Sequence, residues 1–254
     1  LTLFGFDLDF APVVDLDRGR TNNALDRRCF GAEPEEVVPR ARAFLRGLHD
    51  GGVGGCIKHF PGLGGAGEDT HERGSVVYLP LEELRRDLEP FSALANLAGA
   101  VMIGHAVYPA YDATGQPSTV SPTILGGLLR GRLGFEGVAF SDDLGMKALD
   151  AVGGMADRAE AAFAAGCDIL LACHALDEVP PVVERLGQPG LAARREEALG
   201  RWQVYRDRLE TLRLARESAS FVDAAGSRDR LAEVRQALEG IGAMAGGPSR
   251  DELA

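Results

Sequence analysis

The stretch GCIKHFPGLGGAGEDTH, residues 55–71, decides the fold of this chain. Residues 55–60 are short and mostly apolar, as a buried strand is, and a loop rich in glycine and proline follows at once. Lys58, His59, Asp69 and His71 therefore stand at or beyond the end of a predicted strand. In a parallel sheet covered by helices, functional polar residues gather at the carboxyl ends of the strands. The stretch thus predicts one strand–helix unit whose loop carries chemistry.

Four more apolar runs and three helical patterns repeat this arrangement along the chain. The runs are residues 6–14, 100–105, 137–141 and 168–173, and the helical patterns cover residues 34–49, 81–97 and 122–133. Ser121 and Pro122 suit the N-cap and the first helical position of the third helix. Strands that alternate with helices predict a parallel sheet, and here an α/β fold of the TIM-type (β/α) barrel class. Five strands do not close such a barrel, so closure is not expected from this chain alone.

Polar residues follow the predicted strands at nearly every strand end. They are Asp15, His59, His105, Asp142, Asp143 and His174. Since the carboxyl ends of parallel strands meet on one face, this pattern predicts a catalytic face of a barrel.

The pair Asp69 and His71 has the spacing of a carboxylate–imidazole dyad. Residues two apart in an extended segment point the same way, so Asp69 can bind one nitrogen of His71 and leave the other for a substrate. A carboxylate that fixes a histidine in this way prepares it for general acid–base catalysis. The alternative is a mobile polar loop with an incidental Asp–His pair.

The composition excludes several classes of partner. A net charge of −11 and a pI near 5.0 argue against nucleic acid, whose phosphates are neutralised by basic surfaces. No apolar run is long enough to span a membrane, and the start LTLFGFDLDFAP lacks the features of a signal peptide, although the chain does not begin with Met. Cys29, Cys56, Cys167 and Cys173 lack metal-type spacing, which favours reduced thiols, a reducing compartment and a cytoplasmic location.

Several blocks of sequence, in order, resemble one known family. They are LDFAPVVDLD (8–17), RCFG (28–31), KHFPGLGGAGEDTH (58–71), VMIGHAVYP (101–109) and GFEGVAFSDDLGM (134–146). Over residues 5 to 175 the chain resembles glycoside hydrolase family 3, and within it the bacterial β-N-acetylglucosaminidases of the NagZ type. The resemblance implies that Asp142 is the catalytic nucleophile, that His71 is the acid/base and that Asp69 orients it.

The same resemblance implies that Arg28, Lys58 and His59 bind the N-acetylglucosamine. Asp15, His105 and Asp143 are expected to support the pocket rather than to react. No cluster of metal ligands occurs, and the implied mechanism needs neither a metal nor an organic cofactor. The expected domain is a single catalytic barrel over residues 1–254, with helices from about residue 176, a charged segment 191–215 on the outside of the barrel, and a frayed tail from about residue 246.

The chain departs from the family at several positions. Leu63 replaces the second histidine of the loop block, Arg27 stands where an acidic residue is common, and Cys29 where a serine is common. The family's first two strands, which carry a further sugar-binding Asp, have no counterpart here. We therefore expect residues 1–254 to be poorly stable on their own.

The expected function is a retaining exo-β-N-acetylglucosaminidase that removes N-acetylglucosamine from peptidoglycan-derived muropeptides in cell-wall recycling. The expected partner is this small carbohydrate alone, and the complete protein is expected to be a monomer. Two alternatives stay open. One is a β-N-acetylglucosaminide phosphorylase, because a neutral histidine does not repel phosphate as a carboxylate does. The other is an inactive barrel fragment that binds sugar.

Overall fold

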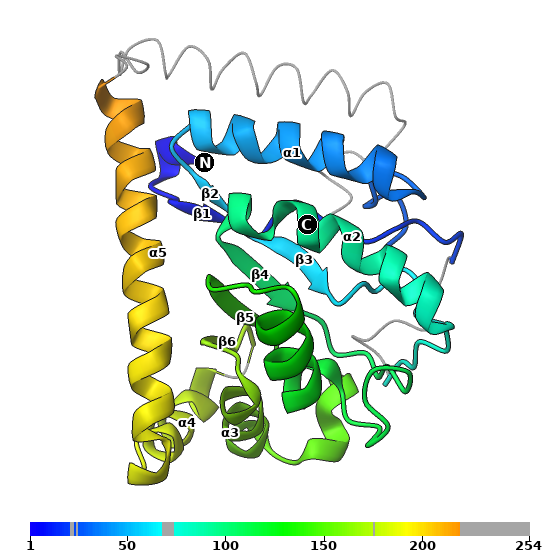
Figure 1. Ribbon diagram of the computed structural model, residues 1–254. Helices are drawn as coiled ribbons and strands as arrows, with labels where there is room; N and C mark the ends of the chain where they lie inside the picture. Colours follow the sequence, from blue (N-terminus) through cyan, green and yellow to red (C-terminus); the bar gives the residue numbers. More distant parts are fainter. Residues whose placement is uncertain (21–22, 24, 68–73, 175, 219–254) are drawn as a thin grey trace, which may run out of the picture.

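The computed structural model describes residues 1–20, 23, 25–67, 74–174 and 176–218 (Figure 1). In chain order its strands and α-helices are β1 (Leu8–Asp9), α1 (Pro34–Asp50), β2 (Gly54–Gly55), β3 (Ile57–Phe60), α2 (Leu81–Ala98), β4 (Ala100–Ile103), β5 (Val138–Asp143), α3 (Met155–Ala165), β6 (Ile169–Leu171), α4 (Val179–Leu186) and α5 (Ala192–Ser218). A π-helix, η3 (Thr123–Arg132), precedes β5. The described residues also include short 3₁₀ helices, namely η1 (Thr2–Phe4), η2 (Ser118–Val120), η4 (Lys147–Val152), η5 (Leu176–Glu178) and η6 (Pro189–Leu191).

The strands form a curved parallel sheet. The order of the larger part is β3-β4-β5-β6, and β1 pairs with β2. A parallel bridge between Val13 and Lys58 connects the two parts. Within the described residues β6 has a strand neighbour on one side only, so the sheet is open there. The predicted α/β class with a parallel sheet is thus confirmed, in the form of a partial (β/α) barrel.

The predicted strands are all present, but the first two are interrupted. Of residues 6–14 only Leu8–Asp9 form a strand, because Pro12 has no N–H to continue the ladder. The run 55–60 divides at Cys56, whose N–H donates to the carbonyls of Asp9 and Ala11. The helix at 122–133 is also present, and Ser121 caps it by accepting the Ile124 N–H at 3.1 Å.

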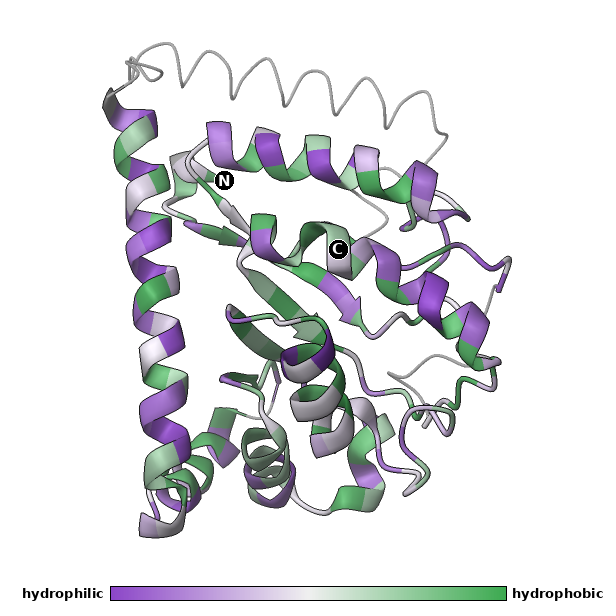
Figure 2. Cartoon of the chain, viewed as in Figure 1, coloured by the Kyte–Doolittle hydropathy of each residue, from purple (hydrophilic) through white to green (hydrophobic). Residues whose placement is uncertain are grey.

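The two faces of the sheet are covered by different helices. Ile57, Val101 and Ala139 belong to the main core, which includes the buried faces of α1 and α2. The alternate residues Cys56, Met102 and Phe140 face the other way. Figure 2 shows these strands as largely hydrophobic and α5 as predominantly hydrophilic.

Helix α5 packs on the face of the sheet that carries Cys56, Met102 and Phe140, a position that the sequence did not predict. We expected this charged helix on the outside of the barrel, but Tyr205 and Leu209 pack against Cys56, Met102 and Phe140. The Tyr205 hydroxyl donates to the Gly55 carbonyl at 3.1 Å. Since β2 and the other strands begin beside α5 and run away from it, the helix closes the amino end of the sheet (Figure 1).

Asp168 attaches α5 to the amino end of β6. Its side chain is fully buried, and Oδ1 accepts hydrogen bonds from Arg194 at 2.6 Å and Arg201 at 3.1 Å. Its Oδ2 accepts from Arg130 at 2.7 Å and from the Ala139 N–H at 2.9 Å. One carboxylate thus joins η3, β5 and α5.

Replacing Asp168 with alanine is expected to lower the free energy of unfolding by about 3–5 kcal/mol, because it leaves three partly buried guanidinium groups without their fully buried counter-charge. Urea denaturation followed by circular dichroism measures the change. Glu197→Ala is the matched control, since Glu197 lies 3.6–3.7 Å from Arg194 and Arg201 but is 60% exposed. Its loss should cost less than about 1 kcal/mol. Equal losses in the two variants would contradict the anchoring role of Asp168.

Candidate active site

The candidate site lies at the carboxyl ends of β3, β4 and β5. His59 is the next-to-last residue of β3, His105 follows β4, and Asp142 is near the end of β5. Because the three strands are parallel neighbours, these residues lie at one edge of the sheet. Asp15, from the segment after β1, reaches the same edge and contacts His59.

Asp142 is a half-buried carboxylate whose surroundings favour its charged form. Its Oδ1 accepts the Asp143 N–H at 2.9 Å. Burial acts to raise its pKa, but the electrostatic influence of His59, His105 and Lys58 and the hydrogen bond from the Asp143 N–H act against burial. Together these groups hold the pKa of Asp142 below its usual value of 3.8. Asp142 is therefore ionised at neutral pH, as an attacking carboxylate must be.

The Asp143 side chain accepts hydrogen bonds from the backbone of the site. Its Oδ1 accepts the N–H groups of Gly145 at 3.1 Å and Cys173 at 3.0 Å, which joins the ends of β5 and β6. Its carbonyl oxygen lies 2.9 Å from Nε2 of His105. Nδ1 of that ring is 2.5 Å from the Thr119 hydroxyl, and burial lowers the pKa of His105. The geometry agrees with the supporting roles expected for Asp143 and His105.

Asp15 holds His59 and the start of the glycine-rich loop. The carboxylate is fully buried, and its Oδ2 lies 2.7 Å from Nδ1 of His59. Its Oδ1 accepts the Leu63 N–H at 2.7 Å, and the His59 N–H lies 3.2 Å from both oxygens. The position of His59 is therefore fixed through both its ring and its backbone.

The charges of Arg28 and Asp142 both influence the pKa of Lys58. Burial lowers the pKa of Lys58, and the charge of Arg28 lowers it further, whereas Asp142 acts to raise it. Arg28 is exposed, in a turn where its N–H donates to the Leu25 carbonyl. The structure thus places Lys58 and His59 near the end of β3, at the same edge of the sheet as Asp142, and the roles of all three predicted sugar-binding residues stay predictions.

The glycine-rich loop packs tightly against its neighbours as far as it is described. A Cβ at Gly64 would lie 2.0 Å from the Leu16 carbonyl oxygen, so only glycine fits there. Leu63 is buried in the main core, which accounts for an apolar residue at this position of the loop. The predicted dyad of Asp69 and His71 lies outside the described residues.

An ion pair behind the loop was not predicted from the sequence. Arg18 donates to Asp87 of α2 at 2.9 Å and to Glu83 at 2.9 Å. Burial raises the pKa of Asp87 to about 7, although Arg18 acts to lower it. Asp87 lies on the same buried face of α2 as Leu84 and Phe91. A carboxylate on an apolar helix face needs a buried partner, and this signal in the sequence could have identified the pair.

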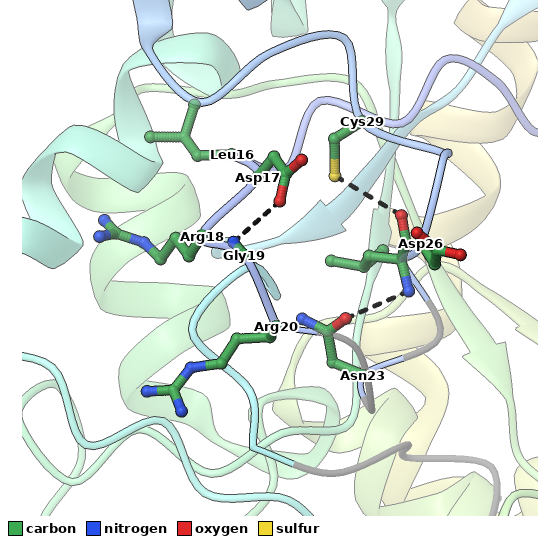
Figure 3. A pocket seen from close by; sticks show the side chains of 9 residues that line it. Leu16, Asp17, Arg18, Gly19, Arg20, Asn23, Asp26 and Cys29 are labelled. Atoms are coloured by element: carbon green, nitrogen blue, oxygen red, sulfur yellow. Dashed lines mark hydrogen bonds between the residues drawn. The ribbon is translucent and has the colours of Figure 1, made fainter.

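A small polar cavity of about 140 Å³ lies beside Arg18 and Cys29 (Figure 3). Asp17 faces it and accepts the Gly19 N–H at 2.9 Å, and the Arg18 side chain extends away from it toward α2. Burial raises the pKa of Cys29 to about 12, so its thiol is protonated and is no nucleophile at neutral pH.

Within the described part of the chain, no group of three or more His, Cys, Asp or Glu side chains is arranged to hold a metal ion. None of the helices described there has the length and apolar character that crossing a membrane requires.

Comparison with known proteins identifies the family. Residues 1–194 match the description "Glycosyl hydrolase family 3 N terminal domain". The chain belongs to glycosyl hydrolase family 3. It is 46% identical over 172 residues to beta-hexosaminidases of Stenotrophomonas maltophilia and Xylella fastidiosa, which covers 67% of this chain and 50% of each relative. The chain therefore spans about half the length of the relatives that it matches.

Two solved structures have a similar arrangement of strands and helices. A beta-N-acetylhexosaminidase from Beutenbergia cavernae superimposes with a TM-score of 0.75 at 32% identity, covering 82% of this chain and 64% of that one. NagZ from Neisseria gonorrhoeae, solved with N-trifluoroacetyl-D-glucosamine, has a TM-score of 0.67 at 39% identity, covering 80% and 56%. The predicted family is thus confirmed, and the fold is that of its barrel domain in part.

Proposed function

We propose that this chain carries the reacting centre of a retaining exo-β-N-acetylglucosaminidase. The observation that carries the proposal is the state of Asp142. It is a half-buried carboxylate at the carboxyl end of a barrel strand, and its pKa is lowered by its electrostatic interactions with His59, His105 and Lys58 and by the Asp143 N–H. A carboxylate that stays ionised next to hydrogen-bond donors suits attack on the anomeric carbon of a bound sugar.

The proposed reaction proceeds in two steps. The Asp142 carboxylate attacks the anomeric carbon and forms a glycosyl ester while the glycosidic C–O bond breaks. His71 gives its proton to the departing oxygen in this step. Water then attacks the anomeric carbon, His71 takes its proton, and Asp142 is released. Two displacements at one carbon give net retention of configuration.

The proposed substrate is a muropeptide with terminal β-linked N-acetylglucosamine, turned over in the cytoplasm during cell-wall recycling by a monomeric enzyme. Resemblance to the NagZ type supports this choice, and so does the sugar analogue with which the Neisseria gonorrhoeae NagZ was solved. Lys58 and Arg28 are suited to the sugar, because together they present several N–H donors for hydroxyl groups.

The test uses a hybrid protein, in which this chain follows the part of the Stenotrophomonas maltophilia relative that precedes its matched region. We expect it to release β-N-acetylglucosamine first from an aryl β-N-acetylglucosaminide, as followed by proton NMR before mutarotation. Inverted α-product would contradict the mechanism. Phosphate should leave turnover unchanged, and formation of a sugar 1-phosphate would instead indicate a phosphorylase. If the hybrid protein showed no turnover, whether or not it bound sugar, the result would favour the alternative of an inactive barrel.

Replacing His71 with alanine in the hybrid protein should reduce turnover more as the leaving group becomes poorer. A good leaving group departs without a proton, whereas an alkoxide needs one, and general acid catalysis is worth about 10²–10⁴-fold. Rates for dinitrophenyl, nitrophenyl and methyl glycosides measure this dependence. If all three rates fell equally, His71 would not be the general acid.

A further inference from the structure

Asp15 is a fully buried carboxylate at the candidate site, and both of its oxygens accept hydrogen bonds. It contacts the ring and the backbone of His59 and the backbone of Leu63, all within 3.2 Å. Leu63 and His59 lie on either side of Phe60, where β3 ends and the glycine-rich loop begins. Asp15 therefore controls a ring at the site and also the path of the chain leading away from it.

The contact also determines which nitrogen of His59 carries a hydrogen toward Asp15. A carboxylate oxygen can only accept, so at 2.7 Å from Oδ2 the Nδ1 atom must be the donor. Nε2 is then the nitrogen available to a ligand, and no residue in the described ranges is hydrogen-bonded to it. His59 and Asp142 lie near the carboxyl ends of β3 and β5, at the same edge of the sheet.

We propose that Asp15 is a positioning residue, which holds His59 with Nδ1–H directed inward and Nε2 presented to a sugar hydroxyl beside Asp142. The sugar in this statement rests on the function proposed above, whereas the orientation of His59 does not. Asp15 itself touches no substrate. Its effect on sugar binding is transmitted through the imidazole ring.

Asp15→Asn tests the proposal with almost no change in shape. The carbonyl oxygen of the new amide can still accept the Leu63 N–H, but its nitrogen now donates toward Nδ1 of His59. Nδ1 must then become the acceptor, and the ring hydrogen moves to Nε2. Long-range ¹H–¹⁵N NMR of the histidine rings, in the chain and in the hybrid protein, should show this exchange of tautomers, and His59→Gln assigns the signals.

Sugar affinity provides the second readout. The dissociation constant for N-acetylglucosamine, measured by NMR titration of the hybrid protein, should rise by about 10- to 100-fold in Asp15→Asn, because a hydrogen bond from the substrate is lost or reversed. In the His59→Gln background the same substitution should have no further effect. Asp168→Asn is the matched control. It changes another buried carboxylate at the opposite end of the sheet and should lower stability without altering the His59 signals.

The outcomes separate the two proposals. A hydrogen on Nε2 of His59 and none on Nδ1 in the unsubstituted protein would overturn the positioning role, even if Asp15→Asn did not fold. Unchanged ring signals in Asp15→Asn, or equal changes in Asp168→Asn, would also overturn it. A tautomer exchange without any affinity for N-acetylglucosamine would uphold the role of Asp15 and count against the proposed function.

Discussion

Replacing Asp142 with alanine is expected to reduce hydrolysis of aryl β-N-acetylglucosaminides by roughly 10⁴-fold or more, the scale seen when a nucleophile is removed. The neighbouring carboxylate of Asp143 cannot take its place, because it is bound to the N–H groups of Gly145 and Cys173. A mechanism-based fluorosugar should label Asp142 in the hybrid protein, and peptide mass spectrometry identifies the labelled residue.

The matched control for Asp142 is Asp143→Asn. Asparagine retains one oxygen for the backbone N–H groups, so a moderate loss of rate with labelling still at Asp142 is expected. Label on Asp143, or full turnover by Asp142→Ala, would contradict the assignment. The pH profile gives an independent check. Since the pKa of Asp142 is lowered, kcat/KM, which reports the first step alone, should not fall with decreasing pH until Asp142 is protonated, below its usual pKa of 3.8.

The sequence predicted the parts of this fold that depend on local pattern. Short apolar runs indicated the strands, and the periodic apolar residues of α1 and α2 indicated the helices almost to their ends. The edge of the sheet at which His59, His105 and Asp142 meet was also predictable, because the carboxyl ends of parallel strands share one edge. The family blocks then added the roles of individual residues.

What the sequence did not show depends on contacts between residues far apart in the chain. Tyr205 and Gly55 are 150 residues apart, and nothing in a charged helix says which face of the sheet it will cover. The bonds of Asp15 with His59 and of Asp87 with Arg18 are of the same kind. A carboxylate is expected at the surface, and only the folded chain shows which cation or N–H makes its burial possible.

The open edge at β6 leads to the second large expected effect, on stability. A closed barrel has no free edge, whereas the described part of this sheet gives β6 no strand beyond it. A mostly apolar hollow of about 280 Å³ lies beside this strand, and Val183 of α4 is 63% exposed there. We expect residues 1–254 alone to melt at low temperature, to associate and to have little activity. In the hybrid protein the melting temperature should rise by roughly 10 °C or more.

Calorimetry and size-exclusion chromatography of the two proteins measure this difference. The control is a hybrid protein with proline in the middle of its added strands, which cannot donate to the ladder and so should not close the sheet. If that control were as stable as the hybrid protein, the gain would not come from strand pairing. The 254-residue chain itself gives the sharper result. Should it prove monomeric, melt cooperatively and hydrolyse as fast as the hybrid protein, then β6 needs no added strand, and the cover that α5 gives to Cys56, Met102 and Phe140 is sufficient for a stable half-barrel.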